Sequence, residues 1–369
     1  MNVQCAFLEK SATMAMDFRL FTHNEEVFMN IRQSFNRALL GAVCGALLLV
    51  SPASAAEKKI VMRYSHSSSA MVKEPHHAAA LDFKNYVEKA TNGKVDVQIY
   101  PGSQLGGEER SFQDIQQGVI QIASLAVNNV TVFSPSMGVF DLPYMFTNYE
   151  DCYKLIDQNW DEINKRMIAE SGNMAVGWLV QGFRVLSNSK RPINTIEDLK
   201  GLKIRVPNNP IMIGVYRAWG TDPVPMAMDE TFNALQQKVV DGQDNPLVSI
   251  ATNRFYEVQK YITEIHYKVW IGPIVVNAAW FKKQPADVQK AILEGGRLAT
   301  ENNRKMIAEM ETDLVKVLKD KGVEILAKPE DEPVWQEKAM GVWPQFYDKI
   351  GDISLLDTMM KSLGRTRPQ

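Results

Sequence analysis

This chain of 369 residues has only three cysteines, and its positive and negative charges nearly balance. Only Cys152 lies beyond the first 55 residues, so an internal disulfide is excluded there. We expect Cys152 to be a buried thiol in a helix rather than a nucleophile. Lysine and arginine number 41 against 43 acidic residues, a formal net charge of -2. Because nucleic-acid binders usually carry a basic excess, we expect no nucleic-acid partner.

Catalytic and metal-binding signatures are also missing. The sequence has no HExxH, G-x-S-x-G, GxxxxGK[ST] or G-x-G-x-x-G motif. His76 and His77 are adjacent, and neighbours on a helix point about 100° apart, which makes them a poor metal pair. They fit the start of a helix better. We therefore predict a protein that is not an enzyme and that has no cofactor and no metal site.

The hydrophobic run at Ala38–Val50 (ALLGAVCGALLLV) has 13 residues, whereas a membrane span needs about 20. Arg37 precedes this run, and the sequence Ala-Ser-Ala at 53–55 follows it. A charged segment, a short apolar segment and small residues are typical of a cleaved signal peptide, with a membrane anchor as the alternative. We predict cleavage after Ala55, a translation start at Met29 and export to the periplasm.

The remaining chain alternates strand and helix patterns, which predicts parallel sheets covered by helices. We predict an α/β fold with the two-lobed architecture of periplasmic binding proteins. Residues 58–181 plus 271–310 would form lobe I, and residues 182–270 plus 311–369 would form lobe II. The predicted strands are 59–64, 95–99, 119–125 and 202–206, and the predicted helices are 76–91, 108–117, 196–200, 211–219 and 229–239.

A long helix is predicted from Pro285 to Lys321, because this stretch contains almost no helix-breaking residues. At 1.5 Å per residue it would be on the order of 50 Å long, enough to span both lobes. The pair Gly295–Gly296 inside it predicts a bend.

Side chains suited to bind an anion lie near predicted strand ends. Arg205 ends the strand in LKIRVPNN, and ligands of open α/β sheets bind at the carboxyl ends of strands. Its planar guanidinium matches a carboxylate, but an arginine in such a position, Arg205 or Arg184, more often forms a surface or structural ion pair. Asn245 precedes a proline and could be only a turn former. Trp178 and Trp270 could stack on a ligand or belong to the core.

Five motifs give the chain a family resemblance. They are TNGKVDVQIYPGSQLGGEE (91–109), FDLPYMF (140–146), GFRVLSN (182–188), EDLKGLKIRVPNNP (197–210) and VPMAMDETFNALQQKVVDGQDNP (224–246). From Ile60 to beyond Lys321, the chain resembles the substrate-binding proteins of tripartite ATP-independent periplasmic (TRAP) transporters. The resemblance implies two α/β domains that close around a buried ligand, with a long helix spanning both.

The resemblance also implies the roles of individual residues. Arg205 would pair with the ligand carboxylate, Arg184 would assist, Asn245 would contact the ligand, and Asn208 would line the pocket. Sialic-acid-binding members have Phe at the position of Met228 and Glu at the position of Ala126, which argues against a sialic-acid ligand here. The remaining candidate pocket residues, by rough alignment, are Ser65, His66, Asn128, Trp178 and Trp270.

We therefore expect a monomeric binding protein that captures a small organic anion, a carboxylate or a sulfonate, and passes it to membrane permease subunits. A receptor that feeds a sensor kinase is the first alternative, because one fold hosts several uses. An enzyme acting on a small acid is the second alternative, which the missing catalytic signatures disfavour.

Overall fold

The computed structural model describes residues 59–369, and residues 58–369 form one compact unit. The predicted start at Met29 and cleavage after Ala55 lie outside the described residues. Between residues 59 and 369, no helix combines the length and the apolar character needed to cross a membrane.

One ten-stranded sheet runs through the molecule, and its main path has the order β2-β1-β3-β9-β4-β7-β5-β6. The pairs β1–β2, β1–β3, β5–β6, β5–β7 and β8–β10 are parallel. The strands are β1 (Ile60–Ser65), β2 (Val95–Tyr100), β3 (Ile122–Ser124), β4 (Asn173–Asn188), β5 (Lys203–Val206), β6 (Asp222–Pro225), β7 (Gly242–Pro246), β8 (Tyr261–Thr263), β9 (Val269–Asn277) and β10 (Glu324–Leu326).

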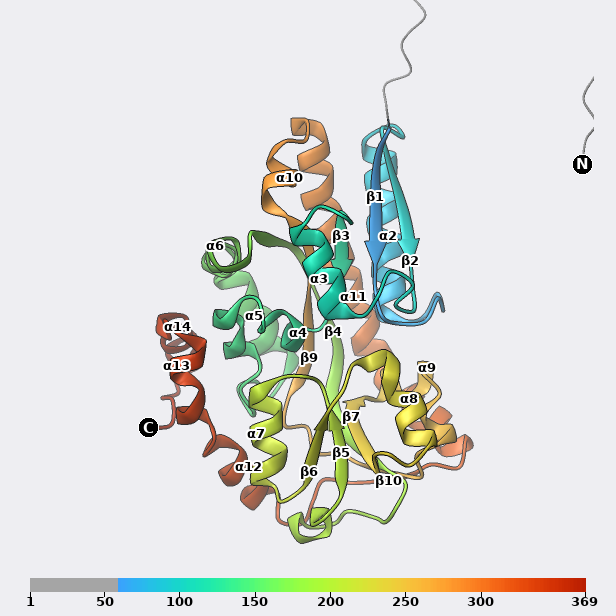
Figure 1. Cartoon of the computed structure of the whole chain (residues 1–369), viewed down its shortest axis with the longest axis vertical. Helices are drawn as coiled ribbons and strands as arrows, with labels where there is room; N and C mark the ends of the chain where they lie inside the picture. The colour runs from blue at the N-terminus through green and yellow to red at the C-terminus, as the bar shows by residue number, and fades with distance from the viewer. Residues whose placement is uncertain (1–58) are drawn as a thin grey trace, which may run out of the picture. The chain divides into compact units, whose positions relative to one another are not determined.

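The long strand β4 joins two sheet regions. Its first part pairs antiparallel with β9, next to β3, β1 and β2, and its last part pairs with β7 and β8. A register shift between Val180 and Gly182 marks the change, and Gly182 has a φ of 118° that favours glycine. Figure 1 shows the two regions at opposite ends of the unit. The two-lobed α/β fold is thus confirmed, while the lobe boundaries remain a prediction.

The strand predicted at 119–125 is shorter in the structure, at Ile122–Ser124, because residues 119–121 still belong to the turn after Gly118, whose φ is 73°.

Helices cover both regions of the sheet, at positions close to those predicted. The helices are α2 (Pro75–Ala90), α3 (Glu108–Gln116), α4 (Val127–Val130), α5 (Tyr149–Gln158), α6 (Trp160–Ser171), α7 (Pro210–Ala218), α8 (Met228–Gln236), α9 (Leu247–Thr252), α10 (Ala278–Lys282), α11 (Ala286–Asp320), α12 (Glu332–Met340), α13 (Tyr347–Ile350) and α14 (Ser354–Ser362), with 3-10 turns at Pro135–Phe140, Ile196–Leu199, Phe255–Glu257 and Trp343–Phe346.

The long helix α11 has 35 residues and packs against α2 and β4 in the first region and against α9 and β10 in the second. Its prediction is confirmed. The structure gives the pair Gly295–Gly296 a packing role. A Cβ at position 296 would lie 1.9 Å from the carbonyl oxygen of Val176 on β4, so only glycine permits this contact. Gly296 therefore lets α11 approach the sheet, while a Cβ at Gly295 would lie 2.9 Å from the side chain of Val87 on α2.

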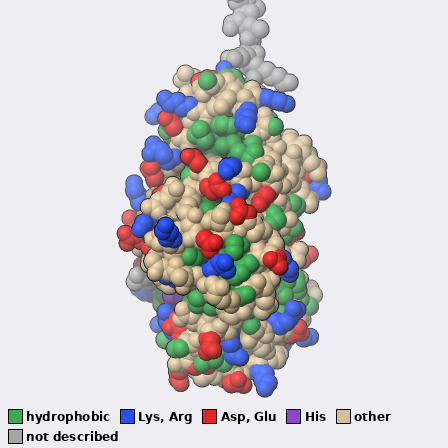
Figure 2. Space-filling model, turned by 90° about the vertical axis from the view of Figure 1, so that its left-hand side faces the viewer, with side chains coloured by type: hydrophobic (Ala, Val, Ile, Leu, Met, Phe, Trp, Pro, Cys, Tyr) green, Lys and Arg blue, Asp and Glu red, His purple; other side chains and the backbone are tan. Residues whose placement is uncertain are grey.

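Apolar side chains from both sheet faces form the core. Cys152 is fully buried with a free thiol, as expected, and burial raises its pKa well above the ordinary value. On the face shown in Figure 2, acidic and basic side chains are interspersed with hydrophobic ones. This face has no broad region of one charge.

Candidate functional site

A pocket of about 540 Å³ lies where the beginnings of α3 and α8 approach the end of β5. The helix starts are close together, since a Cβ at Gly107 would lie 3.6 Å from Oδ1 of Asp229. Most of the lining residues have polar or charged side chains, and three predicted site residues belong to the lining: Arg205, Asn208 and Met228. The other lining residues are Ser67, Ser103, Gly107, Glu108, Glu109, Arg110, Gln113, Asn129, Pro225, Met226, Ala227 and Asp229.

Arg205 lies on β5 between buried Ile204 and Val206, and its own side chain is buried. Its Nε and Nη2 donate to the carbonyl oxygen of Met226, at 3.0 and 2.7 Å. Among residues 59–369, no carboxylate lies within salt-bridge distance of it. Burial, and then repulsion from Arg184, lower the pKa of Arg205 to about 10. The pocket therefore contains a buried cation that makes no salt bridge with any residue between 59 and 369.

Glu108 is a lining residue that the sequence analysis missed. Its Oε1 accepts a hydrogen bond from Ser67 Oγ at 2.5 Å. Its Oε2 accepts two, from the backbone N–H of Ala126 at 2.7 Å and from Asn129 Nδ2 at 2.6 Å. Position 108 opens α3, where the helix dipole favours a negative charge. The acidic pair after Gly106–Gly107 was the available sequence signal.

The next carboxylate, Glu109, interacts with Asn208. Burial and the nearby Glu108 raise the pKa of Glu109 above its ordinary value, while a hydrogen bond with Asn208 opposes this rise. Asn208 is exposed and lines the pocket from the loop after β5. The acidic start of α3 therefore meets the end of β5 across the pocket.

Arg184 has a carboxylate partner. Its Nε lies 2.8 Å from Asp244 Oδ2, and its Nη2 donates to the backbone and side-chain oxygens of Asp244 at 2.7 and 3.2 Å. Burial would lower the pKa of Arg184, but the attraction of Asp244 outweighs it and raises this pKa. Arg184 does not line the pocket. This arrangement favours a structural role over the predicted contact with a ligand.

Four other predicted residues, Asn245, Asn128, Ser65 and His66, do not belong to the lining of this pocket. Asn245 is buried and reaches the pocket through Met228, with its Nδ2 at 3.7 Å from the Met228 sulfur. Asn128 donates to Asn129 Oδ1 at 2.9 Å, and it is Asn129 that lines the pocket. Ser65 bonds to Ser111, and His66 bonds to His77. Because successive side chains point in different directions, Ser67 and Asn129 occupy the lining instead.

Trp178 and Trp270 both belong to the hydrophobic core, which was one of the two alternatives for them. Trp178 packs on Phe140, with ring centres 5.3 Å apart, and Trp270 packs on His76 at 4.7 Å. Neither lines the pocket. Their contact with a ligand stays a prediction.

A buried polar network connects α2, β4 and α9 outside the pocket. Glu74 caps α2 through the backbone N–H of His77 at 2.9 Å, and it accepts from Gln181 Nε2 at 2.9 Å. Ser249 Oγ donates to Gln181 Oε1 at 2.9 Å. Burial raises the pKa of Glu74 to about 7. Within residues 59–369, no group of His, Cys, Asp and Glu side chains could hold a metal ion.

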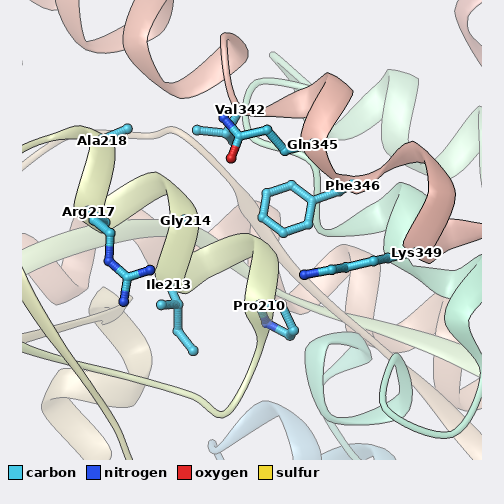
Figure 3. Close-up of a pocket in the computed structure, with 9 residues that line it drawn as sticks. All are labelled: Pro210, Ile213, Gly214, Arg217, Ala218, Val342, Gln345, Phe346 and Lys349. Atoms are coloured by element: carbon cyan, nitrogen blue, oxygen red, sulfur yellow. The ribbon is translucent and has the colours of Figure 1, made fainter.

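A second pocket, of about 520 Å³, lies between α7 and the 3-10 turn and short helix near residues 342–349 (Figure 3). Arg217 and Lys349 border it, and Phe346 packs against Gly214, where a Cβ would lie 2.8 Å from the ring. None of the predicted site residues lines this pocket. The pocket at Arg205 is therefore the better candidate site.

Residues 66–350 match the family model for bacterial extracellular solute-binding proteins, family 7. The chain belongs to this family. The chain is similar to a TRAP periplasmic solute-binding protein of Rhodobacter sphaeroides, whose open apo crystal structure is 39% identical in sequence, with a TM-score of 0.70. That match covers 83% of this chain and 99% of the other.

Two other solved TRAP solute-binding proteins contain organic acids. The protein of Sulfurospirillum deleyianum, with succinate, is 30% identical with a TM-score of 0.75, covering 82% of this chain and 98% of that one. The protein of Polaromonas sp. JS666, with D-erythronate, is 26% identical with a TM-score of 0.77, covering 82% and 98%. The resemblance inferred from the motifs is thus confirmed.

Proposed function

We propose that this family 7 solute-binding protein works in the periplasm as a monomer, binds one small organic acid in the pocket at Arg205, and delivers it to the membrane permease of a TRAP transporter. The observation that carries the ligand site is the buried guanidinium of Arg205, which has no carboxylate partner among the described residues. The ligand carboxylate would supply the missing negative charge.

The energetics support this assignment. An unpaired buried charge is costly, and an arginine fork with a carboxylate forms strong, charge-assisted hydrogen bonds of about 1.5–3 kcal/mol each. Nε and Nη2 of Arg205 already donate to Met226. The guanidinium has five N–H donors, so donors remain for a ligand. A bound acid therefore relieves the unfavourable burial of Arg205, which gives binding a clear electrostatic driving force.

The relatives support the ligand class. Succinate and D-erythronate, which occupy two similar structures, both carry a carboxylate that would fit Arg205. An enzymatic function finds less support. The lining contains neither histidine nor cysteine, so no serine–histidine pair lies within it, although it includes Ser67 and Ser103. Ser67 instead bonds to Glu108.

The proposal is tested by a thermal-shift screen of the ligand-free protein against organic acids, followed by calorimetry of the hits. A ligand that binds only the folded state stabilises it by about 2.7 kcal/mol at a concentration one hundred times its Kd. We expect at least one carboxylic acid to give this shift. A protein that remains unaffected by the whole panel contradicts the proposal.

A further inference from the structure

The lining of the Arg205 pocket has more acidic than basic groups. Its carboxylates are Glu108, Glu109 and Asp229, and its cations are Arg205 and Arg110. Arg110 already pairs with Asp114, at 2.8 Å from its Nε. Among the described lining residues, Arg205 is thus the cation that lacks a carboxylate partner. One ligand carboxylate neutralises Arg205, and a second would face carboxylates.

Glu108 is fixed in position by three donors from two separate segments: Ser67 just after β1, and the backbone of Ala126 and the side chain of Asn129 at α4. A carboxylate offers about four acceptor sites. The two bonds to Oε2 and the single bond to Oε1 leave one acceptor site, on Oε1. A hydroxyl group can donate to this site, whereas a ligand carboxylate has no proton to donate and is repelled.

We infer that Glu108 makes the pocket selective for hydroxylated monocarboxylates, whose carboxylate pairs with Arg205 and whose hydroxyl donates to Glu108, and that it disfavours dicarboxylates. This inference rests on the proposed function, because it requires a ligand at Arg205. Glu108 and Asp229 line the same pocket as Arg205 and attract its charge without forming a salt bridge. The pocket therefore contains charges of both signs.

Three acids of four carbons separate hydroxyl recognition from charge repulsion. D-erythronate is a hydroxylated monocarboxylate, butyrate is a monocarboxylate without hydroxyls, and succinate is a dicarboxylate. With the wild-type protein, calorimetry should give D-erythronate an affinity at least tenfold above that of either other acid. Succinate or butyrate binding as tightly as D-erythronate overturns the inference, and this comparison requires no mutation.

The variant Glu108→Gln removes the negative charge but keeps a side chain of the same size. We expect the ratio of D-erythronate to succinate affinity to fall at least tenfold, with succinate affinity rising. The exposed residue Glu337 on α12 provides the control, and Glu337→Gln, with the same change of charge, should keep the wild-type ratio. An unchanged ratio in a folded Glu108→Gln variant, checked by circular dichroism, contradicts the inference.

Failure of this inference differs from failure of the proposed function. If the wild type binds succinate at least as well as D-erythronate, and Arg205→Ala abolishes that binding, the function stands and the selectivity is wrong. If no organic acid binds, or if Arg205→Ala leaves binding unchanged, the proposed site itself is wrong and the inference falls with it.

Discussion

Two buried arginines lie on strands that flank β7, and they differ in what balances their charge. Arg184 on β4 forms a salt bridge with the carboxylate of Asp244. This carboxylate also accepts a hydrogen bond from the hydroxyl of Tyr267 at 2.6 Å. The side chain of Arg205 on β5 bonds only to the backbone carbonyl of Met226 among residues 59–369, and its pKa is lowered. Both side chains are nearly inaccessible, at 2% and 3% exposure. Burial alone therefore does not distinguish a structural arginine from a ligand-binding one.

What distinguishes them is the state of their partners. A paired buried charge belongs to the folded scaffold, and its removal leaves an opposite charge uncompensated. An unpaired buried charge beside a cavity is unfavourable until a ligand arrives. The comparison predicts that mutation of Arg184 affects mainly stability, while mutation of Arg205 affects mainly ligand affinity.

The largest expected effect is on stability. Arg184→Ala leaves Asp244 buried with only the bond from Tyr267, so the free energy of unfolding of the ligand-free protein should fall by about 3–5 kcal/mol. Urea unfolding of the ligand-free wild type and variant measures this difference. A loss below about 1 kcal/mol would mean that the ion pair with Asp244 is not structural, and the comparison would break.

Glu74 extends the comparison to a buried acid without a salt bridge among the described residues. Burial raises its pKa to about 7 from 4.5, so the folded state holds this proton more tightly than the unfolded chain between these pH values. Its contribution to stability is present at low pH and is lost as the pH rises through 7. Burial, and then repulsion from His77, lower the pKa of His66 from 6.5 to about 3. His66 therefore makes the folded state more stable as the pH rises from 3 to 6.5, the opposite of the effect of Glu74.

The variant Glu74→Gln isolates this contribution from that of the histidines. The free energy of unfolding of the wild type, minus that of the variant, should fall by on the order of 3 kcal/mol between pH 4.5 and 8. Denaturant titrations at several pH values measure it. If the difference stays constant with pH, Glu74 does not titrate in this range.

The smallest effect comes from a change that keeps the charge. Arg205→Lys retains a cation but loses the planar fork, so affinity for an organic acid should fall about tenfold, or about 1.4 kcal/mol. Calorimetry of the wild type and the Lys variant with the same acid gives the ratio. A loss of affinity as large as that of Arg205→Ala would show that the planar shape of the guanidinium, rather than its positive charge, determines ligand binding.

The sequence predicted the alternation of strands and helices well, because each element carries its own boundary signal. Asn92–Gly93 ends a helix with two positive φ values, and Thr195 with Asp198 forms a capping box before the 3-10 turn. The helix from Ala286 to Asp320 followed from a lack of helix breakers. Local rules were enough for these elements.

Contacts between distant residues were harder to predict. The carboxylate of Glu108 is held in the pocket by Ser67, Ala126 and Asn129, which lie 41, 18 and 21 residues away from it along the chain. The partner of Arg184 is 60 residues away, so the sequence left open whether that arginine or Arg205 was paired. The sequence predicted a bend at Gly296 and gave no sign of its close contact with Val176 on β4.

The central claim is that Arg205 binds the ligand carboxylate and is not part of the scaffold. Arg205→Ala tests it when affinity and ligand-free stability are measured on the same preparation. The account predicts an affinity loss of about thirtyfold to several thousandfold, corresponding to about 2–5 kcal/mol for a buried, unpaired ligand anion. It predicts a melting temperature of the ligand-free protein at or above that of the wild type. An affinity within about threefold of wild type, together with a lower melting temperature, would contradict the claim, because one tenfold change already corresponds to about 1.4 kcal/mol.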